Sequence, residues 1–337
     1  MHIAVDVREL CGRPTGVGRY LTGLLEAWAE NHKALRHQWT LYSHAPATLP
    51  GRWAPHLRVI DGGGGSAWEQ LTLPRAINAQ RPDVFFAPGY TAPLSVATPL
   101  VLTIHDVSFF AHREWFAFRE GLRRRTLTAW SARRARTVIT DSQFSKIEIG
   151  KYVGIDAARV KVIPLGIDRP AATGRYGQAG DPREPVVLYA GSIFARRRVD
   201  RLIEAFDVVA GRVPAATLEI VGENRTSNPR LDLAALAQRG RHRDRIHIRS
   251  YVDDETLAGL YGRASVFAFL SEYEGFGFTP LEALAAGVAP VVLDTPIARE
   301  TCGPAARYVS PSATAADVAD AITGLLTNAA ERRELLQ

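Results

Sequence analysis

Short apolar segments alternate with longer segments of helical character along almost the whole sequence of 337 residues. This alternation is typical of parallel β-sheets that carry helices on both faces, because each parallel strand must be joined to the next by a crossover. We therefore predict an α/β fold. The expected strands are Ile3–Val7, Trp39–Tyr42, Leu57–Ile60, Val84–Ala87, Leu100–Ile104, Thr137–Thr140, Val160–Ile163, Val186–Ala190, Leu218–Val221, Ile246–Ile248, Val266–Leu270 and Pro290–Leu293.

A stretch rich in Gly, Pro and Ala, residues 169–185, separates two groups of these strands and has the composition of a linker. The sequence therefore predicts an N-terminal domain over 1–168 and a C-terminal domain over 186–337, each with a doubly wound, Rossmann-like parallel sheet. The chain is long enough for both domains to have their own core. We expect the carboxyl ends of the two sheets to face each other across a cleft.

The composition, with 46% hydrophobic and 23% charged residues, is typical of a soluble globular protein. No apolar run is long enough to predict a transmembrane helix, and the first residues resemble a strand rather than a secretion signal. Cys11 and Cys302 lie far apart and lack the spacing of metal ligands, which favours a reducing cytoplasm. The sequence thus predicts a cytoplasmic protein.

Glycines follow the strand expected at residues 266–270. Gly275 and Gly277 permit a tight turn or a close approach of backbone to a ligand. Glu274 precedes them at the carboxyl edge of the sheet, where open α/β sheets bind ligands. A helix is expected next, and its N-terminal N–H groups and dipole suit a phosphate. This stretch therefore predicts a site for a phosphorylated ligand.

The start of that helix is predicted from local residue preferences. Thr279 suits the N-cap, Pro280 the first helical position, and Gly287 the end of the helix. Glu282, three residues after Thr279, completes a capping box. Two interpretations of Glu282 stay open: a helix cap, or a contact to a ligand.

Three consecutive arginines, Arg196 to Arg198, follow Gly191 and the strand expected at 186–190. Arginine stays charged and holds phosphate oxygens in pairs, so this segment predicts a diphosphate clamp. An exposed basic helix start explains it less well, because cations at a helix N-terminus oppose the helix dipole.

The segment from Glu274 to Gly287, E-G-F-G-F-T-P-L-E-A-L-A-A-G, resembles the Glu-x7-Glu signature of the family 4 retaining glycosyltransferases. The segment I-P-L-G-I-D, residues 163–168, resembles the family's end of the first domain. L-D-T-P-I-A-R-E, residues 293–300, resembles its mannosyl- and rhamnosyltransferase-like group. The resemblance implies the GT-B fold, with a nucleotide-diphospho sugar bound mainly by the second domain.

The resemblance also implies roles for single residues. Arg196, Arg197 and the amides of the glycine loop would stabilise the departing diphosphate, Glu282 would hold the ribose, and Glu274 a hydroxyl of the transferred sugar. His105 would contact that sugar from the other domain. The expected catalytic residues are His105, Glu274, Arg196 and Arg197. The expected donor-binding residues are Gly16, Gly18, Ser192, Arg196, Arg197, Gly275, Phe276, Gly277, Phe278 and Glu282.

Two of these predictions concern the first domain. Gly16 and Gly18 do not complete a dinucleotide fingerprint, because Leu21 stands where the third glycine belongs. They serve either a tight turn or, as the resemblance implies, a loop near the donor diphosphate and the acceptor. His105 ends an apolar strand, and Asp106 after it is expected to orient the ring.

The sequence departs from the family at two places. Arg197 stands where a lysine is usual, which keeps the charge and changes the shape. The family usually continues into a long helix that returns to the first domain, whereas only residues 327–337 follow here after Leu325 and Leu326. The crossover helix is therefore expected to be short or missing, or the sequence to be truncated.

No two aspartates stand two residues apart, so the D-x-D motif of metal-dependent transferases is absent, and we predict no metal and no other cofactor. The predicted function is a retaining, metal-independent transfer of a hexose from a nucleotide-diphospho sugar, with a slight preference for GDP-mannose, to a glycan or lipid-linked acceptor in bacterial glycan assembly. Two alternatives stay open: a nucleotide-sugar 2-epimerase-like enzyme, and a catalytically silent nucleotide-binding subunit.

The net charge of +6 raises the question of anionic partners. Nucleic acid is not predicted, because no known module is visible and the arginines do not form a stripe with stacking aromatics. Residues 112–136 combine arginines with aromatic side chains. A solvated helix face is the simpler interpretation, and peripheral contact with an anionic membrane is the alternative.

Overall fold

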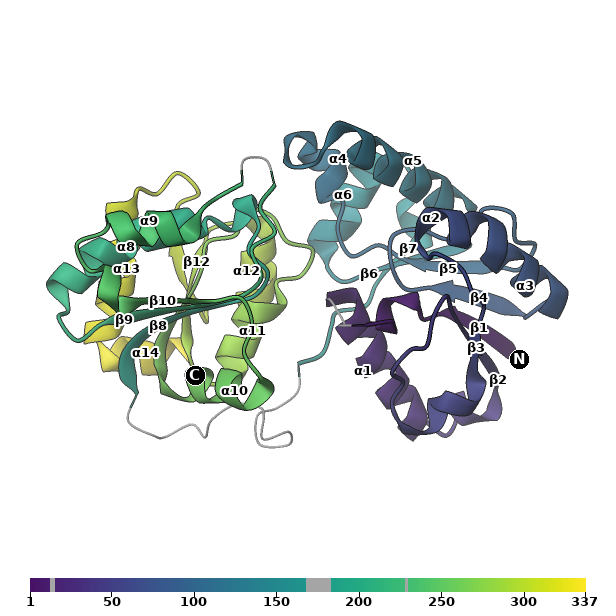
Figure 1. Ribbon diagram of the computed structural model, residues 1–337, viewed down its shortest axis with the longest axis horizontal. Coiled ribbons are helices and arrows are strands. Elements are labelled where there is room, and N and C mark those ends of the chain that lie inside the picture. The colour runs from purple at the N-terminus through teal and green to yellow at the C-terminus, as the bar shows by residue number, and fades with distance from the viewer. Residues whose placement is uncertain (13–15, 168–182, 228–229) are drawn as a thin grey trace. The chain divides into compact units, whose positions relative to one another are not determined.

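The computed structural model describes residues 1–12, 16–167, 183–227 and 230–337 (Figure 1). The chain divides into two compact units, Met1–Leu165 and Gly166–Gln337. Most of the expected linker, residues 169–185, lies outside the described residues. Each unit is built around one parallel sheet, and all twelve expected strands are present, with ends within two residues of the prediction.

The N-terminal unit contains a seven-stranded sheet in the order β3-β2-β1-β4-β5-β6-β7, with every pair parallel. The order reverses between β1 and β4, the position at which open α/β sheets bind ligands. The strands are β1 His2–Asp6, β2 Gln38–Ser43, β3 Leu57–Val59, β4 Val84–Ala87, β5 Leu100–Thr103, β6 Thr137–Thr140 and β7 Val160–Val162.

Helices cover both faces of this sheet, because successive strand residues point to opposite sides and both sides are apolar. Ala4 and Val5 of β1 belong to two different buried clusters. The helices are α1 Gly16–Glu30, α2 Gly65–Ala67, α3 Leu73–Gln80, α4 Ser108–Ala111, α5 Phe118–Arg134 and α6 Gln143–Val153. The 3₁₀-helices are η1 Arg8–Leu10, η2 Ala34–Arg36, η3 Gly51–His56, η5 Arg113–Trp115 and η6 Ala157–Arg159, and η4 Trp68–Thr72 is a π-helix.

The C-terminal unit contains a six-stranded parallel sheet in the order β10-β9-β8-β11-β12-β13. Its strands are β8 Glu184–Ala190, β9 Thr217–Val221, β10 Ile246–Arg249, β11 Ala264–Phe269, β12 Ala289–Leu293 and β13 Arg307–Val309. β13 was not predicted. This edge strand has three residues, of which Val309 alone is buried, so it lacks the apolar run that predicts a buried strand.

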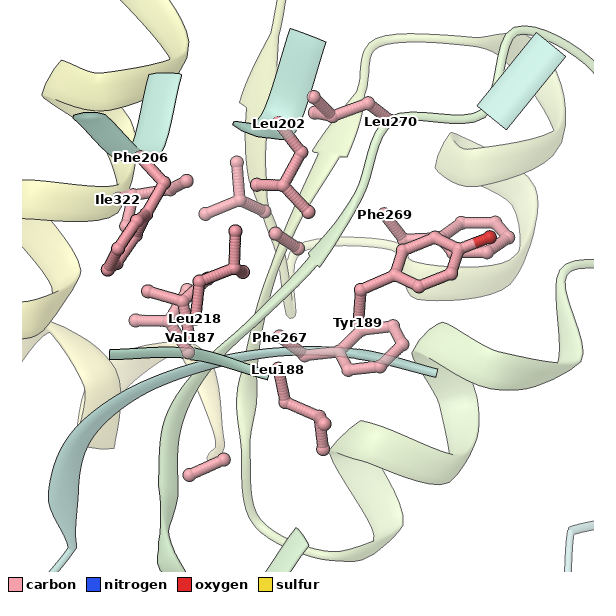
Figure 2. Close-up of a cluster of buried hydrophobic side chains, with 14 of the residues drawn as sticks. Val187, Leu188, Tyr189, Leu202, Phe206, Leu218, Phe267, Phe269, Leu270 and Ile322 are labelled. Carbon is pink, nitrogen blue, oxygen red and sulfur yellow. The ribbon is translucent and has the colours of Figure 1, made fainter. Parts of the chain in front are cut away.

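The core of this unit lies between the sheet and its helices (Figure 2). Leu202 and Phe206 of α8 and Ile322 of α13 join the strand residues in one buried cluster. Tyr189 and Phe269 stack with ring centroids 6.0 Å apart, next to the carboxyl ends of β8 and β11. The helices are α8 Val199–Arg212, α9 Leu233–Arg239, α10 Asp254–Arg263, α11 Phe278–Ala285, α12 Pro296–Cys302, α13 Ala315–Thr327 and α14 Ala329–Leu335, with turns η7 Ala195–Arg197 and η8 Arg243–Arg245.

Within the described ranges, no helix combines the length and the apolar content that crossing a membrane requires.

Candidate active site

The loop between β11 and α11 ends at Gly277, whose φ of 88° lies in the left-handed region that favours glycine. α11 begins directly after it, without a side-chain cap. The prediction that Thr279 caps this helix is therefore wrong. Gly277 has already turned the chain into the helix, so Thr279 lies in the first turn, and its buried Oγ1 has no hydrogen-bond partner among the described residues. Pro280 accordingly falls at the third helical position and not at the first.

Gly287 ends α11, as predicted. Its φ is 69°, its N–H donates to the Leu284 carbonyl (2.9 Å), and the Val288 N–H donates to the Ala283 carbonyl (2.8 Å). This pair of bonds satisfies the last carbonyl groups of the helix. Glu282 is buried inside the helix. Since the N-cap is Gly277, the capping-box interpretation of Glu282 is wrong, and a ligand contact stays a hypothesis.

The side chains of Arg197 and Glu274 form a bidentate ion pair. Nε of Arg197 donates to Oε1 of Glu274 (2.7 Å) and Nη2 donates to Oε2 (3.1 Å). Nη1 of the same arginine donates to the carbonyl of Ser192 (2.8 Å), and Oγ of Ser271 donates to Oε1 of Glu274 (2.8 Å). The two side chains that the sequence analysis assigned to the diphosphate and the sugar thus hold each other.

The ion pair is largely buried, with 13% of the Arg197 side chain and 15% of the Glu274 side chain exposed. Burial alone would raise the pKa of Glu274, but the positive charges of Arg197 and Arg196 outweigh it and hold that pKa below its ordinary value. The pKa of Arg197 is raised, because the Glu274 charge outweighs the cost of burial. Both groups are therefore charged at neutral pH.

Aromatic rings support the two guanidinium groups. Arg197 lies over the Phe269 ring, 4.9 Å from its centroid, and Arg196 lies over the Phe194 ring at 4.4 Å. Nε of Arg196 also donates to the Tyr273 carbonyl (3.3 Å). Cation–π contacts of this kind restrict the arginine rotamers and orient the charges.

Arg198 does not join this arrangement. It adopts a left-handed φ of 48° at the start of α8, and its Nε donates to Glu272 (2.9 Å). The backbone N–H of Glu272 donates to the Arg196 carbonyl (2.9 Å). The arginine segment and the Glu274 loop are therefore joined through both side chains and backbone. The alternating acids Glu272 and Glu274 were the signal in the sequence that could have predicted this pairing.

Close backbone packing positions Ser192. A Cβ on Gly222 would lie 1.9 Å from the Gly191 carbonyl oxygen, so Gly222 is required for the approach of two loops. Ser192 follows Gly191 in the chain, and its carbonyl oxygen accepts hydrogen bonds from Arg197 and from the Tyr189 hydroxyl (3.0 Å). Ser192 thus bonds to the arginine through its backbone, and its contact with a donor stays a prediction.

A narrow hollow with about 290 Å³ of empty space, part of it open to solvent, lies beside the ion pair. Glu274 and Ser271 form its polar edge, and apolar side chains of β12 and α12 form much of its lining. Its lining residues are Phe269, Ser271, Glu274, Phe276, Gly277, Pro280, Val292, Leu293, Thr295, Ile297, Ala298, Thr301 and Cys302.

In the N-terminal unit, Gly16 and Gly18 lie in the first turn of α1 and not in a turn before it, so the tight-turn interpretation is wrong for both. Residues 13–15, the loop before them, lie outside the described residues. α1 reaches the histidine site through Tyr20, whose ring lies 4.9 Å from the His105 ring in an edge-on contact.

His105 follows β5, as expected, but Asp106 does not orient its ring. Nδ1 of His105 lies 2.7 Å from Oδ2 of Asp141, and Nε2 lies 2.9 Å from the Pro88 carbonyl oxygen. Asp106 accepts instead from the Tyr90 hydroxyl (3.0 Å) and the Ser108 N–H (2.7 Å). Asp141 was not predicted as a partner of His105. It follows β6, the neighbour of β5, and parallel neighbours end at the same edge of the sheet.

A second group of buried charges at this edge was also missed. Arg8, after β1, forms ion pairs with Asp6 and Glu69, and the Thr91 hydroxyl donates to Glu69 (2.6 Å). Burial raises the pKa of Asp6 to about 6. These residues were overlooked because Asp6 and Arg8 lie within an apolar strand end, and Glu69 is distant in sequence.

Among the described residues, no three His, Cys, Asp or Glu side chains are grouped as a metal site would group them.

Two family models match the chain. The model described as Glycosyltransferase Family 4 matches residues 14–169, and the model described as Glycosyl transferases group 1 matches residues 177–337. The matches follow one another, with residues 170–176 between them, close to the boundary of the two units at Leu165 and Gly166.

Curated relatives match parts of the chain. Mannosylfructose-phosphate synthase of Agrobacterium fabrum is 32% identical over 155 residues, which are 41% of this chain and 33% of that protein. GDP-mannose:cellobiosyl-diphosphopolyprenol alpha-mannosyltransferase of Xanthomonas campestris is 28% identical over 206 residues, 61% of this chain and 52% of that protein. The chain spans about a third to a half of the length of these relatives.

A solved structure, Anabaena HepE in complex with UDP and glucose, aligns with 100% of this chain and 92% of that chain at a TM-score of 0.74 and 19% identity. At this identity the likeness concerns the fold. Together with the strand orders, it confirms the expected GT-B class of two doubly wound parallel-sheet domains.

Proposed function

Because the chain belongs to the family 4 glycosyltransferases, we propose that it transfers a hexose from a nucleotide-diphospho sugar to a glycan or lipid-linked acceptor in bacterial glycan assembly. The observation that carries this proposal is the arrangement in the C-terminal unit. Two guanidinium groups, the glycine loop and the start of α11 come together at the carboxyl edge of the sheet. Parallel sheets bind nucleotides at this edge.

The chain's own residues would act mainly by electrostatics. Arg196 and Arg197, with the N-terminal end of α11, would stabilise negative charge as it develops on the departing diphosphate. Glu282 would hold the ribose. In this proposal the cationic side chains and the helix end do the work that a metal does in other transferases, so the transfer is metal-independent. Retention of the anomeric configuration is proposed from family membership alone.

The Arg197–Glu274 pair changes the role proposed for Glu274. Its carboxylate accepts two bonds from Arg197 and one from Ser271, so most of its accepting capacity is used. We propose that Glu274 first of all fixes the Arg197 guanidinium, leaving the outer Nη hydrogens for a phosphate oxygen. A contact from Glu274 to a sugar hydroxyl would use its remaining capacity.

For the donor we propose GDP-mannose. The residues 293–300 favour the mannosyltransferase-like group, and a relative from Xanthomonas campestris carries GDP-mannose in its name. HepE, which was solved with UDP and glucose, favours the alternative of a UDP-sugar. His105 is proposed to contribute from the N-terminal unit, and the acceptor to be a glycan or a lipid-linked glycan.

A thermal-shift panel tests the donor site. GDP, UDP, dTDP and ADP are each added with and without Mg²⁺ to the wild type, to Glu282→Ala, and to Glu255→Ala as a control on an exposed residue of α10. We expect one nucleotide to raise the melting temperature without Mg²⁺, because a ligand that binds the native state stabilises it by mass action. The shift should be lost in Glu282→Ala and kept in Glu255→Ala. If no nucleotide shifts the wild type, the proposed donor site is wrong.

Peripheral membrane contact is proposed for the same protein, which we place in the cytoplasm. Phe118, Leu122 and Trp130 of α5 are exposed, at 77%, 49% and 53%. Phe118 and Leu122 lie together near the start of the helix, one turn apart. Trp130 lies on the face of α5 opposite the buried Thr128 and Ala132. Exposed arginines share that face, and such a mixture of aromatic and basic side chains suits the surface of an anionic bilayer.

A further inference from the structure

Both nitrogens of the His105 ring face hydrogen-bond acceptors. Nδ1 lies 2.7 Å from the Asp141 carboxylate, and Nε2 lies 2.9 Å from the Pro88 carbonyl oxygen. A neutral imidazole has one N–H and one bare nitrogen. In that form, one bare nitrogen would face the lone pairs of an oxygen at less than 3 Å. Each of the two contacts therefore needs a proton of its own.

The second proton belongs on the ring. A histidine is ordinarily more basic than a carboxylic acid, so the arrangement with an imidazolium and a carboxylate is favoured over a neutral ring and a protonated Asp141. Oδ1 of Asp141 is buried and has no hydrogen-bond partner among the described residues. The carboxylate thus depends on the ring for the neutralisation of its charge.

The remaining groups around the ring agree with a positive charge. The Tyr20 and Tyr90 rings lie edge-on to it, with centroids 4.9 Å and 5.6 Å away. Burial raises the pKa of Tyr20 to about 12, so its hydroxyl is neutral. Asp106 is the other carboxylate near the ring, and its negative charge favours a protonated ring. None of these groups is a cation that would oppose the imidazolium.

We propose that Asp141 is a positioning residue that keeps His105 as an imidazolium with both N–H groups oriented. His105 then serves the reaction as a fixed positive charge and an N–H donor, and never as a base. A sugar or acceptor hydroxyl is contacted by Nε2–H in exchange for the Pro88 carbonyl. The role in the reaction rests on the proposed function, whereas the protonation state of the ring does not.

The decisive measurement follows the His105 ring itself by ¹⁵N-resolved NMR of histidine-labelled full-length protein across a pH series, with the signal assigned by its loss in His105→Gln. We expect both ring nitrogens to be protonated at pH 7, with the pKa of the ring above its ordinary value. In Asp141→Asn the pKa should fall by about one unit or more, because the carboxylate no longer stabilises the charged ring. In Asp106→Asn, the matched control, the fall should be smaller, because that carboxylate does not bond to the ring.

A neutral ring with one bare nitrogen at pH 7 in the wild type would overturn the proposal without any variant. An unchanged titration in a folded Asp141→Asn would do the same. Once a donor is identified, transfer should decline as pH rises through the pKa of the ring, and Asp141→Asn should move this decline to lower pH. Activity that rises with pH through the same range would identify His105 as a base and contradict the proposal. If the titration is as expected while no nucleotide binds, the proposed function fails and the assignment of the ring stands.

Discussion

At the scale of single residues, the site is defined by pairings that join distant parts of the sequence. Arg197 and Glu274 were each predicted to meet the ligand, and the structure has them bonded to each other. His105 was predicted with its neighbour Asp106 and is bonded to Asp141. In both cases the residue type and its place after a strand led to the predicted functional role, and that role stays a prediction. The bonding partner of each residue depends on which strand ends are neighbours in the sheet. The local sequence around a residue does not carry that information.

Because of the Arg197–Glu274 pair, we expect the free energy of unfolding to decrease at acid pH. The pKa of Glu274 is lowered from the ordinary 4.5, so its contribution is fully present above pH 4.5 and is lost as the pH falls through the lowered value. We expect wild type to exceed Glu274→Gln in free energy of unfolding at pH 7, and this difference to shrink below pH 4.5. Urea unfolding across pH measures it, with Glu255→Gln as an exposed control. A difference that stays constant down to about pH 3 would contradict the role of the pair.

At the scale of elements, the starts of α11 and α13 in the C-terminal unit differ in their capping. Thr314 caps α13 in a capping box with Asp317, whereas Thr279 of α11 has a buried hydroxyl that bonds to nothing among the described residues. Replacement of Thr314 by valine should cost about 1 kcal/mol, because a first-turn N–H loses its partner. Thr279→Val should be neutral or stabilising, because it removes a buried, unsatisfied hydroxyl. Chemical denaturation of both variants tests this, and equal losses would mean that Thr279 does cap its helix.

The case of Thr279 also shows where prediction from sequence ends. The glycines, the helix and Gly287 at its end were predicted correctly, because glycine and helix preferences act locally. The N-cap was placed two residues too late, at Thr279, because Gly277 in a left-handed conformation occupies the N-cap position instead. The short edge strand β13 escaped prediction for a related reason, since its three residues have no strong pattern of their own.

α5 permits a test of the proposed membrane contact. We expect the protein to sediment with vesicles that contain an anionic phospholipid and to bind less to purely zwitterionic vesicles. Binding should decrease by several fold in Phe118→Ser/Trp130→Ser, because these exposed side chains supply the apolar contact. Leu71→Ser removes an apolar side chain of η4 that is 62% exposed and serves as the control. Equal loss in both variants, or no binding to anionic vesicles, would contradict a contact through α5.

At the scale of the whole molecule, the sequence predicted the two-domain plan because the plan is repeated. Counted from the first strand of each unit, six strands follow the same order in both sheets, with the reversal beside the first strand, and the N-terminal sheet adds a seventh strand at its edge. Apolar strands at regular intervals are enough to predict such sheets without knowledge of any single contact. The pattern does not show which unit binds which part of the substrates. Of the predicted site residues, Gly16, Gly18 and His105 belong to the N-terminal unit, and the arginines, Glu274 and Glu282 belong to the C-terminal unit.

Hydrogen exchange with a bound nucleoside diphosphate tests which unit binds the nucleotide. The diphosphate that gives the largest thermal shift is added to the full-length chain, and amide exchange is compared with and without it. If the C-terminal unit supplies the donor site, protection should increase in residues 191–198 and 271–287, because ligand binding suppresses local opening of the loops that it contacts. The segments 100–106 and 137–145, which hold His105 and Asp141, should change little, because a nucleotide without its sugar lacks the group that His105 is proposed to contact. Protection centred on these two segments instead would assign the nucleotide to the N-terminal unit and reverse the proposed roles.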